Sequence, residues 1–73
     1  MPSAVSMGDV KRMLELCAPG HEITLRNHFR FVKWRGIVYP TLPKHDVIHA
    51  GHVRKMARTF GILDCAKTFL GIQ

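Results

Sequence analysis

The sequence has few acidic residues, few aromatic residues and only two cysteines. Five Asp and Glu stand against eleven Lys and Arg, which gives a formal net charge of +6. Its 73 residues predict one domain, and a chain this short buries only about 60% of the surface that its unfolded form exposes. We therefore expect chemistry on an open surface, and no cofactor.

The chain also lacks a long apolar run and a cysteine framework. No stretch approaches the ~20 apolar residues that span a bilayer, and the N-terminal "MPSAVSMGDV" lacks the basic and apolar regions of a signal peptide. Cys17 and Cys65 belong to no C-x-x-C pair, so we expect buried free thiols in a reducing compartment. These absences predict a soluble, cytoplasmic protein without a membrane partner.

What the chain does contain is a concentration of positive charge. Residues 26–58 hold eight Lys and Arg and a single acid, Asp46. Such one-sided charge indicates an anionic partner, because Lys and Arg bind phosphates by displacing counterions. Nucleic acid is the main hypothesis. The alternatives are an acidic partner protein, or basic residues that only keep the chain soluble.

The first amphipathic segment carries helix signals at both ends. Ser6 followed by Asp9 resembles a capping box. "APG" at 18–20 ends the helix, because Pro19 cannot continue its hydrogen bonding. Between these signals one apolar stripe repeats at i, i+3, i+4 and i+7, formed by Val10, Met13, Leu14 and Cys17.

The next twenty residues alternate with period two, which predicts three short strands in "HEITLR", "HFRFVKW" and "GIVYP". Asn27 is expected to turn the first strand into the second, and "KWRG", with Gly36 at positive φ, the second into the third. Pro40 and Pro43 should end this antiparallel meander, because proline donates no hydrogen bond to a sheet. The side chains expected to face the core are those of Leu25, Phe29 and Phe31.

A second helix is predicted after "HDVIHAGH", with Gly61 at its end and an apolar stripe of Val53, Met56, Ala57 and Phe60. "ILDCAKTFL", residues 62–70, is either a short third helix or a surface that docks onto another chain. The order α-β-β-β-α predicts a two-layer α+β domain with a core at 6–61 and a C-terminal extension at 62–73. Two helices on one face leave the other sheet face open.

The stretch "LRNHFRF", residues 25–31, is expected to expose a histidine between two arginines on that open face, with Arg26, His28 and Arg30 side by side. Imidazole can take and give a proton near neutral pH. RNA carries its own nucleophile, the 2′-hydroxyl, so cleavage requires a base, an acid and cations on the phosphate. His28 is therefore the candidate catalytic residue. The other reading is an exposed histidine without a role.

A larger set of residues is expected to bind RNA. Trp34 and Tyr39 could stack an unpaired base, and the start of the second helix could hold a phosphate. The predicted RNA-binding residues are Arg26, Asn27, Arg30, Lys33, Arg35, Lys44, His45 and His49. Lys33, Lys44, His45 and His49 are all candidates for the general acid or for a phosphate clamp.

One histidine spacing also resembles a metal-binding helix face. His45, His49 and His52 would share a side if the second helix began early. No cysteine or acidic fourth ligand accompanies them, and structural zinc prefers four ligands. We expect no metal.

Three motifs and their order resemble the HicA-type toxins of bacterial toxin–antitoxin pairs. "VKRMLELCAPG" is similar to that family's first helix, and "RNHFRF" to its Gly-Ser-His strand motif, with Arg26 and Asn27 in place of glycine and serine. "YPTLPKHDVIHAGHVRKMARTFGI" is similar to its last strand, its Pro and His loop, and its closing helix. The resemblance covers about residues 9–63.

The resemblance implies a small mRNA interferase with a double-stranded-RNA-binding-like fold. It implies that the catalytic histidine is His28, that cleavage needs no metal, and that a cognate HicB-type antitoxin covers the active face. The alternative from the residues alone is a non-catalytic RNA- or DNA-binding module in which His28 only contacts a phosphate. A basic protein that binds acidic protein only is a third reading.

Overall fold

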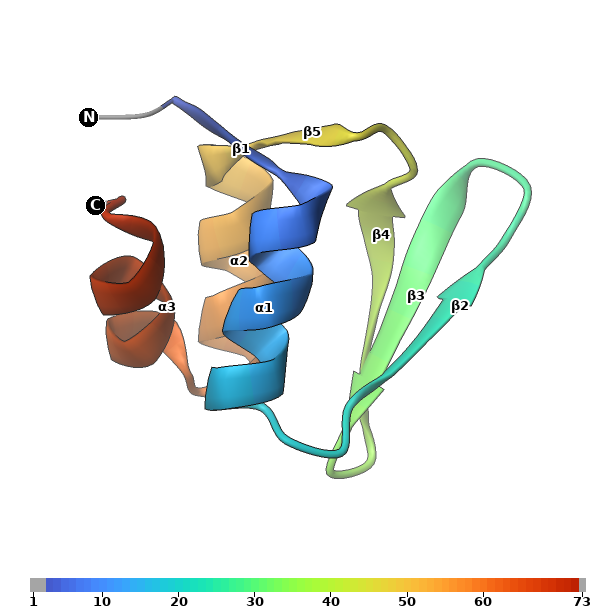
Figure 1. Cartoon of the computed structure of the whole chain (residues 1–73). Coiled ribbons are helices and arrows are strands. Elements are labelled where there is room, and N and C mark those ends of the chain that lie inside the picture. The colour runs from blue at the N-terminus through green and yellow to red at the C-terminus, as the bar shows by residue number, and fades with distance from the viewer. Residues whose placement is uncertain (1–2, 73) are drawn as a thin grey trace.

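The computed structural model describes residues 3–72. Met1 and Pro2, which begin the stretch "MPSAVSMGDV", and Gln73, which ends the C-terminal extension, lie outside it. It is a small α+β fold with two sheets and three helices (Figure 1). Its elements in chain order are β1 (Ala4–Ser6), α1 (Met7–Cys17), β2 (Glu22–Leu25), β3 (Phe29–Trp34), β4 (Ile37–Pro43), β5 (Val47–His49), α2 (Ala50–Phe60) and α3 (Leu63–Leu70).

The two predicted helices are confirmed, and so are their end signals. The Ser6 hydroxyl accepts a hydrogen bond from the Asp9 backbone N–H at 3.1 Å, which caps α1. Gly61 has a φ of 73° and ends α2 in the left-handed conformation that glycine adopts without strain. Of the two readings of residues 62–70, the structure has the short helix, α3.

The expected antiparallel meander is also confirmed, with strand order β2-β3-β4. Trp34 pairs with Ile37, so the β3–β4 turn consists of Arg35 and Gly36. Both have positive φ, 53° and 77°, the pattern of the two-residue type I′ turn that matches the twist of a hairpin.

The prediction that Pro40 ends the last strand is wrong. β4 continues through it to Pro43, because the strand bulges. Arg30 pairs with Leu42 and Val32 with Tyr39, so two steps along β3 correspond to three along β4. The extra residue of a bulge leaves the ladder, which accommodates the missing N–H of proline. Tyr39 and Leu42, three positions apart, therefore both face the core.

A second, two-stranded sheet was not predicted. β1 pairs antiparallel with β5, with Val5 opposite Ile48. Further hydrogen bonds join the same segments, from the Met7 N–H to the Asp46 carbonyl at 2.7 Å and from the Ala50 N–H to the Ser3 carbonyl at 2.8 Å. The starts of both long helices are thereby held together.

The core lies between the three-stranded sheet and the helices α1 and α2, which stand on one side of it (Figure 1). The side chains of β3 that reach this core are Val32 and Trp34, not Phe29 and Phe31 as predicted. Successive side chains of a strand point to opposite faces, so burying Val32 and Trp34 turns both phenylalanines outward. Leu25, also predicted as core, is 64% exposed at the end of β2.

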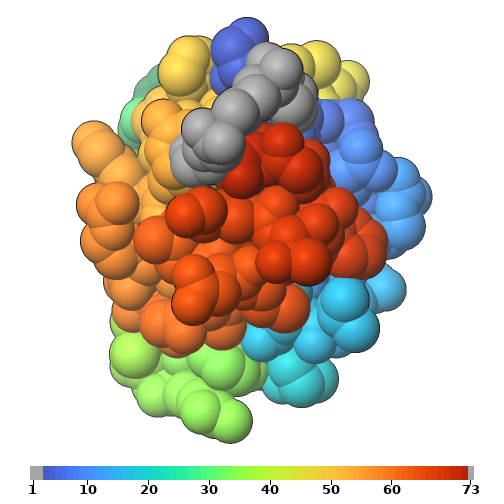
Figure 2. Space-filling view, turned by 90° about the vertical axis from the view of Figure 1, so that its left-hand side faces the viewer, coloured from blue at the N-terminus to red at the C-terminus, as the bar shows by residue number. Residues whose placement is uncertain are grey.

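The expectation of free thiols is wrong, because Cys17 at the end of α1 and Cys65 in α3 form a disulfide with Cα atoms 5.9 Å apart. α3 lies across α1 and α2 (Figure 2). Its own fully buried residue is Ala66, with Leu63 and Leu70 packed against the core. The covalent bond therefore supplements a modest apolar contact.

The disulfide also removes the argument from cysteine usage for a reducing compartment, since such bonds persist mainly where the surroundings are oxidising. Between residues 3 and 72, no helix has both the length and the apolar character needed to cross a membrane.

Candidate nucleic-acid interface

His28 lies at the tip of the β2–β3 hairpin. The Arg26 N–H donates to the Phe29 carbonyl at 2.8 Å, so Asn27 and His28 are the two residues that turn the chain. This confirms Asn27 as a turn residue and moves His28 from the strand face to the turn. His28 is exposed at this position.

Contrary to the prediction, Arg30 does not lie on the open face of the sheet. It stands opposite Leu25 and Leu42 in the sheet. Its side chain is on the side of the helices, because Arg30 lies two positions from the buried Val32 and the two residues share a face of β3. Its guanidinium Nη1 donates to the Pro43 carbonyl at 2.6 Å and to the His45 carbonyl at 3.0 Å. Arg30 therefore fixes the loop after β4 against the hairpin.

Lys44, in the loop after β4, contacts the tip of the β2–β3 hairpin. Its ammonium Nζ donates to the Asn27 carbonyl at 3.1 Å, directly beside His28 in the chain. His45, the next loop residue, is exposed and is held through the carbonyl that Arg30 binds. We call the group of Asn27, His28, Lys44 and His45 the tip site. Two segments distant in sequence are thus cross-linked by hydrogen bonds at one end of the sheet.

Arg26 and Lys33 lie on the outer face of the sheet, away from the helices. The Arg26 guanidinium carbon is 5.2 Å from the centroid of the Phe31 ring, a cation–π contact. Lys33 stands opposite Glu22 on β2. The Arg26 and Lys33 side chains are both exposed.

Arg35 and the predicted stacking residues belong to the other end of the sheet. The Arg35 guanidinium lies over the Trp34 ring, 4.4 Å from its centroid. Trp34 is only 9% exposed, and Tyr39 is also buried. Neither side chain can therefore stack a base, contrary to the prediction. Trp34 instead donates from Nε1 to the Pro19 carbonyl at 3.0 Å and contacts Phe60 edge-on.

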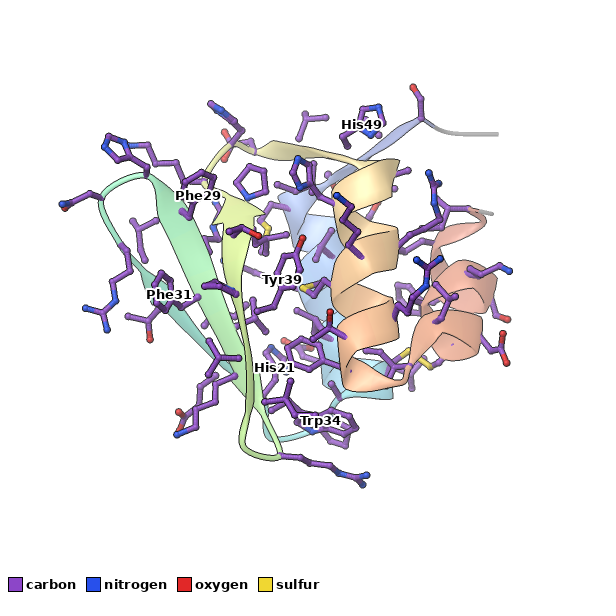
Figure 3. All side chains as sticks on the ribbon, turned by 180° about the vertical axis from the view of Figure 1, so that it is seen from behind. His21, Phe29, Phe31, Trp34, Tyr39 and His49 are labelled. Carbon is purple, nitrogen blue, oxygen red and sulfur yellow. A yellow bond between two sulfur atoms is a disulfide. The ribbon has the colours of Figure 1, made fainter. Side chains whose placement is uncertain are left out.

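The exposed aromatic surface that sequence reasoning missed is formed by Phe29 and Phe31. Phe29 is 42% exposed and Phe31 is partly exposed. Figure 3 shows Phe31 on the side of the hairpin away from the helices, whereas Trp34 and Tyr39 point toward them. The sequence carries no local signal for this, because Val32 and Trp34 alternate on the opposite face of the same strand as regularly as the two phenylalanines.

His49 is the N-cap of α2, and its Nδ1 accepts from the Gly51 N–H at 3.0 Å (Figure 3). Within residues 3–72, the side chains of Lys33, Arg35 and His49 form no hydrogen bond with the tip site. The same part of the chain contains no cluster of three His, Cys, Asp or Glu side chains that could hold a metal ion. The spacing of His45, His49 and His52 therefore does not produce such a cluster.

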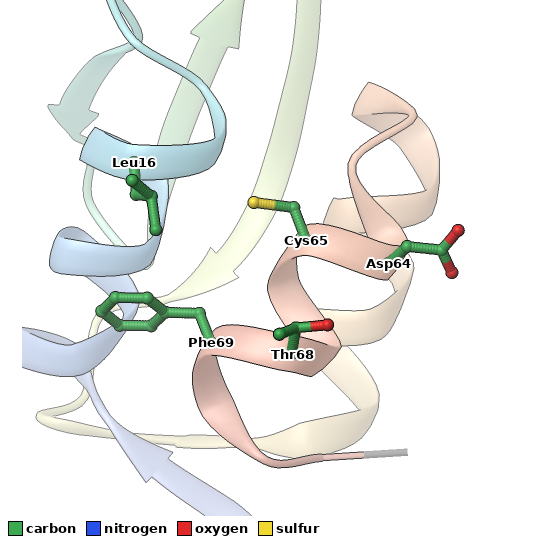
Figure 4. Close-up of a pocket in the computed structure, with 5 residues that line it drawn as sticks. All are labelled: Leu16, Asp64, Cys65, Thr68 and Phe69. Carbon is green, nitrogen blue, oxygen red and sulfur yellow. The ribbon is translucent and has the colours of Figure 1, made fainter.

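A shallow pocket of about 360 Å³ lies between α1 and α3, next to the disulfide. Leu16 and Phe69 face each other across it (Figure 4), and its lining is mostly apolar. α3, which contributes most of its lining, lies on the side of α1 and α2 away from the sheet (Figure 1). The pocket therefore does not contribute to the tip site.

No family model, curated protein or solved structure matches the chain. The likeness to the HicA-type toxins thus depends on the sequence motifs and on the order of the elements.

Proposed function

We propose that the protein binds RNA at the tip site and cleaves it without a metal, as a toxin of the HicA type would. The observation that carries the proposal is the pair of hydrogen-bonded braces, Lys44 to Asn27 and Arg30 to the loop carbonyls, which join an exposed histidine to a cationic loop. The net charge of +6 supplies attraction for a phosphate chain.

In this mechanism His28 removes the proton of a ribose 2′-hydroxyl. The resulting oxygen attacks the adjacent phosphorus, and the bond to the 5′-oxygen of the next nucleotide breaks. Lys44 stabilises the charge that builds on the phosphate oxygens, and His45 gives a proton to the leaving oxygen. The products are a 2′,3′-cyclic phosphate and a free 5′-hydroxyl.

The braces favour His45 and Lys44 over the other candidates for the general acid. Both belong to the loop that Arg30 and Lys44 hold against the hairpin. His49 already uses Nδ1 to cap α2, and Lys33 stands opposite Glu22 on the sheet. The proposed pair is therefore His28 as base and His45 as acid.

The double-stranded-RNA-binding-like arrangement is part of the same proposal. The order α1-β2-β3-β4-α2, with both helices on one side of an antiparallel sheet, supports it (Figure 1). The β1–β5 sheet and α3 are additions to that plan. A cognate antitoxin with an acidic surface would cover the tip site and silence it.

A non-catalytic RNA-binding module is the second candidate, and one observation favours it. Arg26 and Arg30, the two arginines beside His28 in sequence, are engaged with the Phe31 ring and with backbone carbonyls. In this case Lys44 and His28 only contact phosphates.

The first test compares His28→Ala with wild type on a labelled RNA in the presence of a chelator. We expect cleavage to fall by about 100-fold or more, because a positioned base contributes roughly that much, while RNA affinity stays within about tenfold. His52→Ala, a histidine of α2 outside the tip site, is the matched control and should cleave normally.

Equal cleavage by His28→Ala and wild type would exclude His28 as the base. RNA binding without cleavage by wild type would establish the non-catalytic module. Absence of RNA binding at low salt would reject both candidates and favour an acidic protein as the partner.

A further inference from the structure

The three-stranded sheet is covered by helices on one face only. Strand pairing identifies the outward side chains, because residues directly opposite each other in a sheet point to the same side. Thr24 stands opposite Phe31 and Phe29 opposite Pro43. Val38, which stands opposite Lys33, is 43% exposed. Phe29 and Val38 are thus exposed on this face, and Phe31 is partly covered by the Arg26 guanidinium.

We propose that this outer face binds single-stranded RNA by stacking its bases on Phe31 and Phe29. The inference rests on the proposed function and extends it, because it specifies unpaired RNA as the substrate and places the strand along β3 beside the tip site. We call Phe29, Phe31 and Val38 the sheet platform.

The spacing of the two rings suits consecutive bases. Residues two apart in a strand are separated by about 7 Å and share a face. Bases of an extended single strand can each rest on one such ring, whereas paired bases in a duplex are closed to stacking. The platform therefore selects unpaired RNA.

The charges around the platform favour a polyanion over an apolar partner. The Arg26 guanidinium already lies over Phe31 at 5.2 Å, and Lys44 contacts the hairpin tip at Asn27. Glu22 lies on the same face, opposite Lys33 at the far end of the hairpin. Within residues 3–72 neither Arg26 nor Lys44 forms an ion pair, although Asp46 follows His45 in the same loop. Their charges lie at the end of the sheet where Phe29 adjoins His28, and the phosphates of a stacked strand would run there.

The proposal is tested with a fluorescent, unstructured ten-nucleotide RNA titrated at low and moderate salt. We expect Phe31→Ala and Phe29→Ala each to weaken binding about tenfold, as loss of one stacked base does. The slope of affinity against salt should stay unchanged, because no phosphate contact is lost. Phe31→Trp should restore binding, since indole also stacks.

Leu16→Ala is the matched control, because Leu16 is an exposed apolar residue on the opposite side of the molecule, 64% exposed. It should bind RNA like wild type. Thermal unfolding of every variant shows that lost affinity does not reflect lost folding.

Three results would overturn the platform. They are full affinity in both phenylalanine variants, equal binding of wild type to duplex and single strand, and a wild-type dimer that Phe31→Ala converts to a monomer. Each leaves the proposed function intact as long as wild type still binds RNA and His28→Ala abolishes cleavage. Failure of wild type to bind any RNA would instead reject the proposed function.

Discussion

The two hairpin turns of the same sheet are held in different ways. At the β3–β4 end, Arg35 and Gly36 turn with positive φ, and Arg35 folds back over Trp34, which is anchored in the core. At the β2–β3 end, Asn27 and His28 turn beside a separate loop, which Lys44 and Arg30 bind to the hairpin. One end is fixed by local backbone geometry and the core, the other by polar contacts between segments.

This difference separates a structural end from a candidate functional end. Buried apolar contacts are strong and leave no polar group free, whereas polar braces near the surface keep an imidazole and an ammonium accessible. Substitutions at the first end should therefore change stability without changing RNA binding, whereas those at the second end should change RNA binding, with or without a loss of stability.

The largest expected effect is on stability, from Trp34→Ala. The change removes a buried indole, its contact with Phe60 and the donor to the Pro19 carbonyl. Loss of a buried Trp costs about 3–5 kcal/mol, a large part of the stability of a small domain. Urea unfolding measures it. Phe29→Ala, in the same strand but exposed, is the control and should cost far less; equal losses would contradict the assignment of faces.

An intermediate effect is expected from Arg30→Met, which keeps the aliphatic stem and removes the donor to two carbonyls. Hydrogen bonds from a charged donor contribute roughly 1.5–3 kcal/mol, and the partial exposure of Arg30 places the expected loss at the lower end. RNA affinity should also fall, because the loop with Lys44 and His45 is released.

Arg35→Met is the matched change at the other end of the sheet. Its cation–π contact lies at the surface and contributes about 0.5–1 kcal/mol. It should leave RNA affinity unchanged. If Arg35→Met weakens RNA binding as much as Arg30→Met, the distinction between the two ends is wrong.

The smallest effect on stability is expected from Lys44→Ala. Lys44 is exposed, so the free energy of unfolding should change by less than about 0.5 kcal/mol. RNA affinity should nevertheless decrease, and its dependence on salt should become shallower by about one unit of slope, as loss of one phosphate contact predicts. Lys11→Ala on α1 provides the control. An unchanged salt slope in Lys44→Ala would remove Lys44 from the interface.

The elements of this fold could be predicted where a local signal decides the outcome. The Ser6 cap, the apolar stripes and Gly61 define the helices, and Gly36 defines a turn. The three-residue strands β1 and β5 are too short for any periodicity to be detected.

The faces of β3 could not be predicted, because "FRFVKW" carries apolar residues on both. Phe29 and Phe31 alternate as regularly as Val32 and Trp34, so the pattern allows either pair to be buried. Only packing against α2, where Trp34 meets Phe60, decides between them. Arg30 and the two phenylalanines therefore lie on the opposite faces from those predicted. His28 is exposed as predicted, but it lies in the hairpin turn and not on the sheet face.

The disulfide between Cys17 and Cys65, which are 48 positions apart in the sequence, closes the chain between them into a covalent ring. Every strand of the meander, β5 and α2 are contained in that ring. A single nick in the peptide backbone anywhere inside it, the hairpin tip included, opens the ring without producing two molecules. The fragments separate only after a thiol has reduced the bridge.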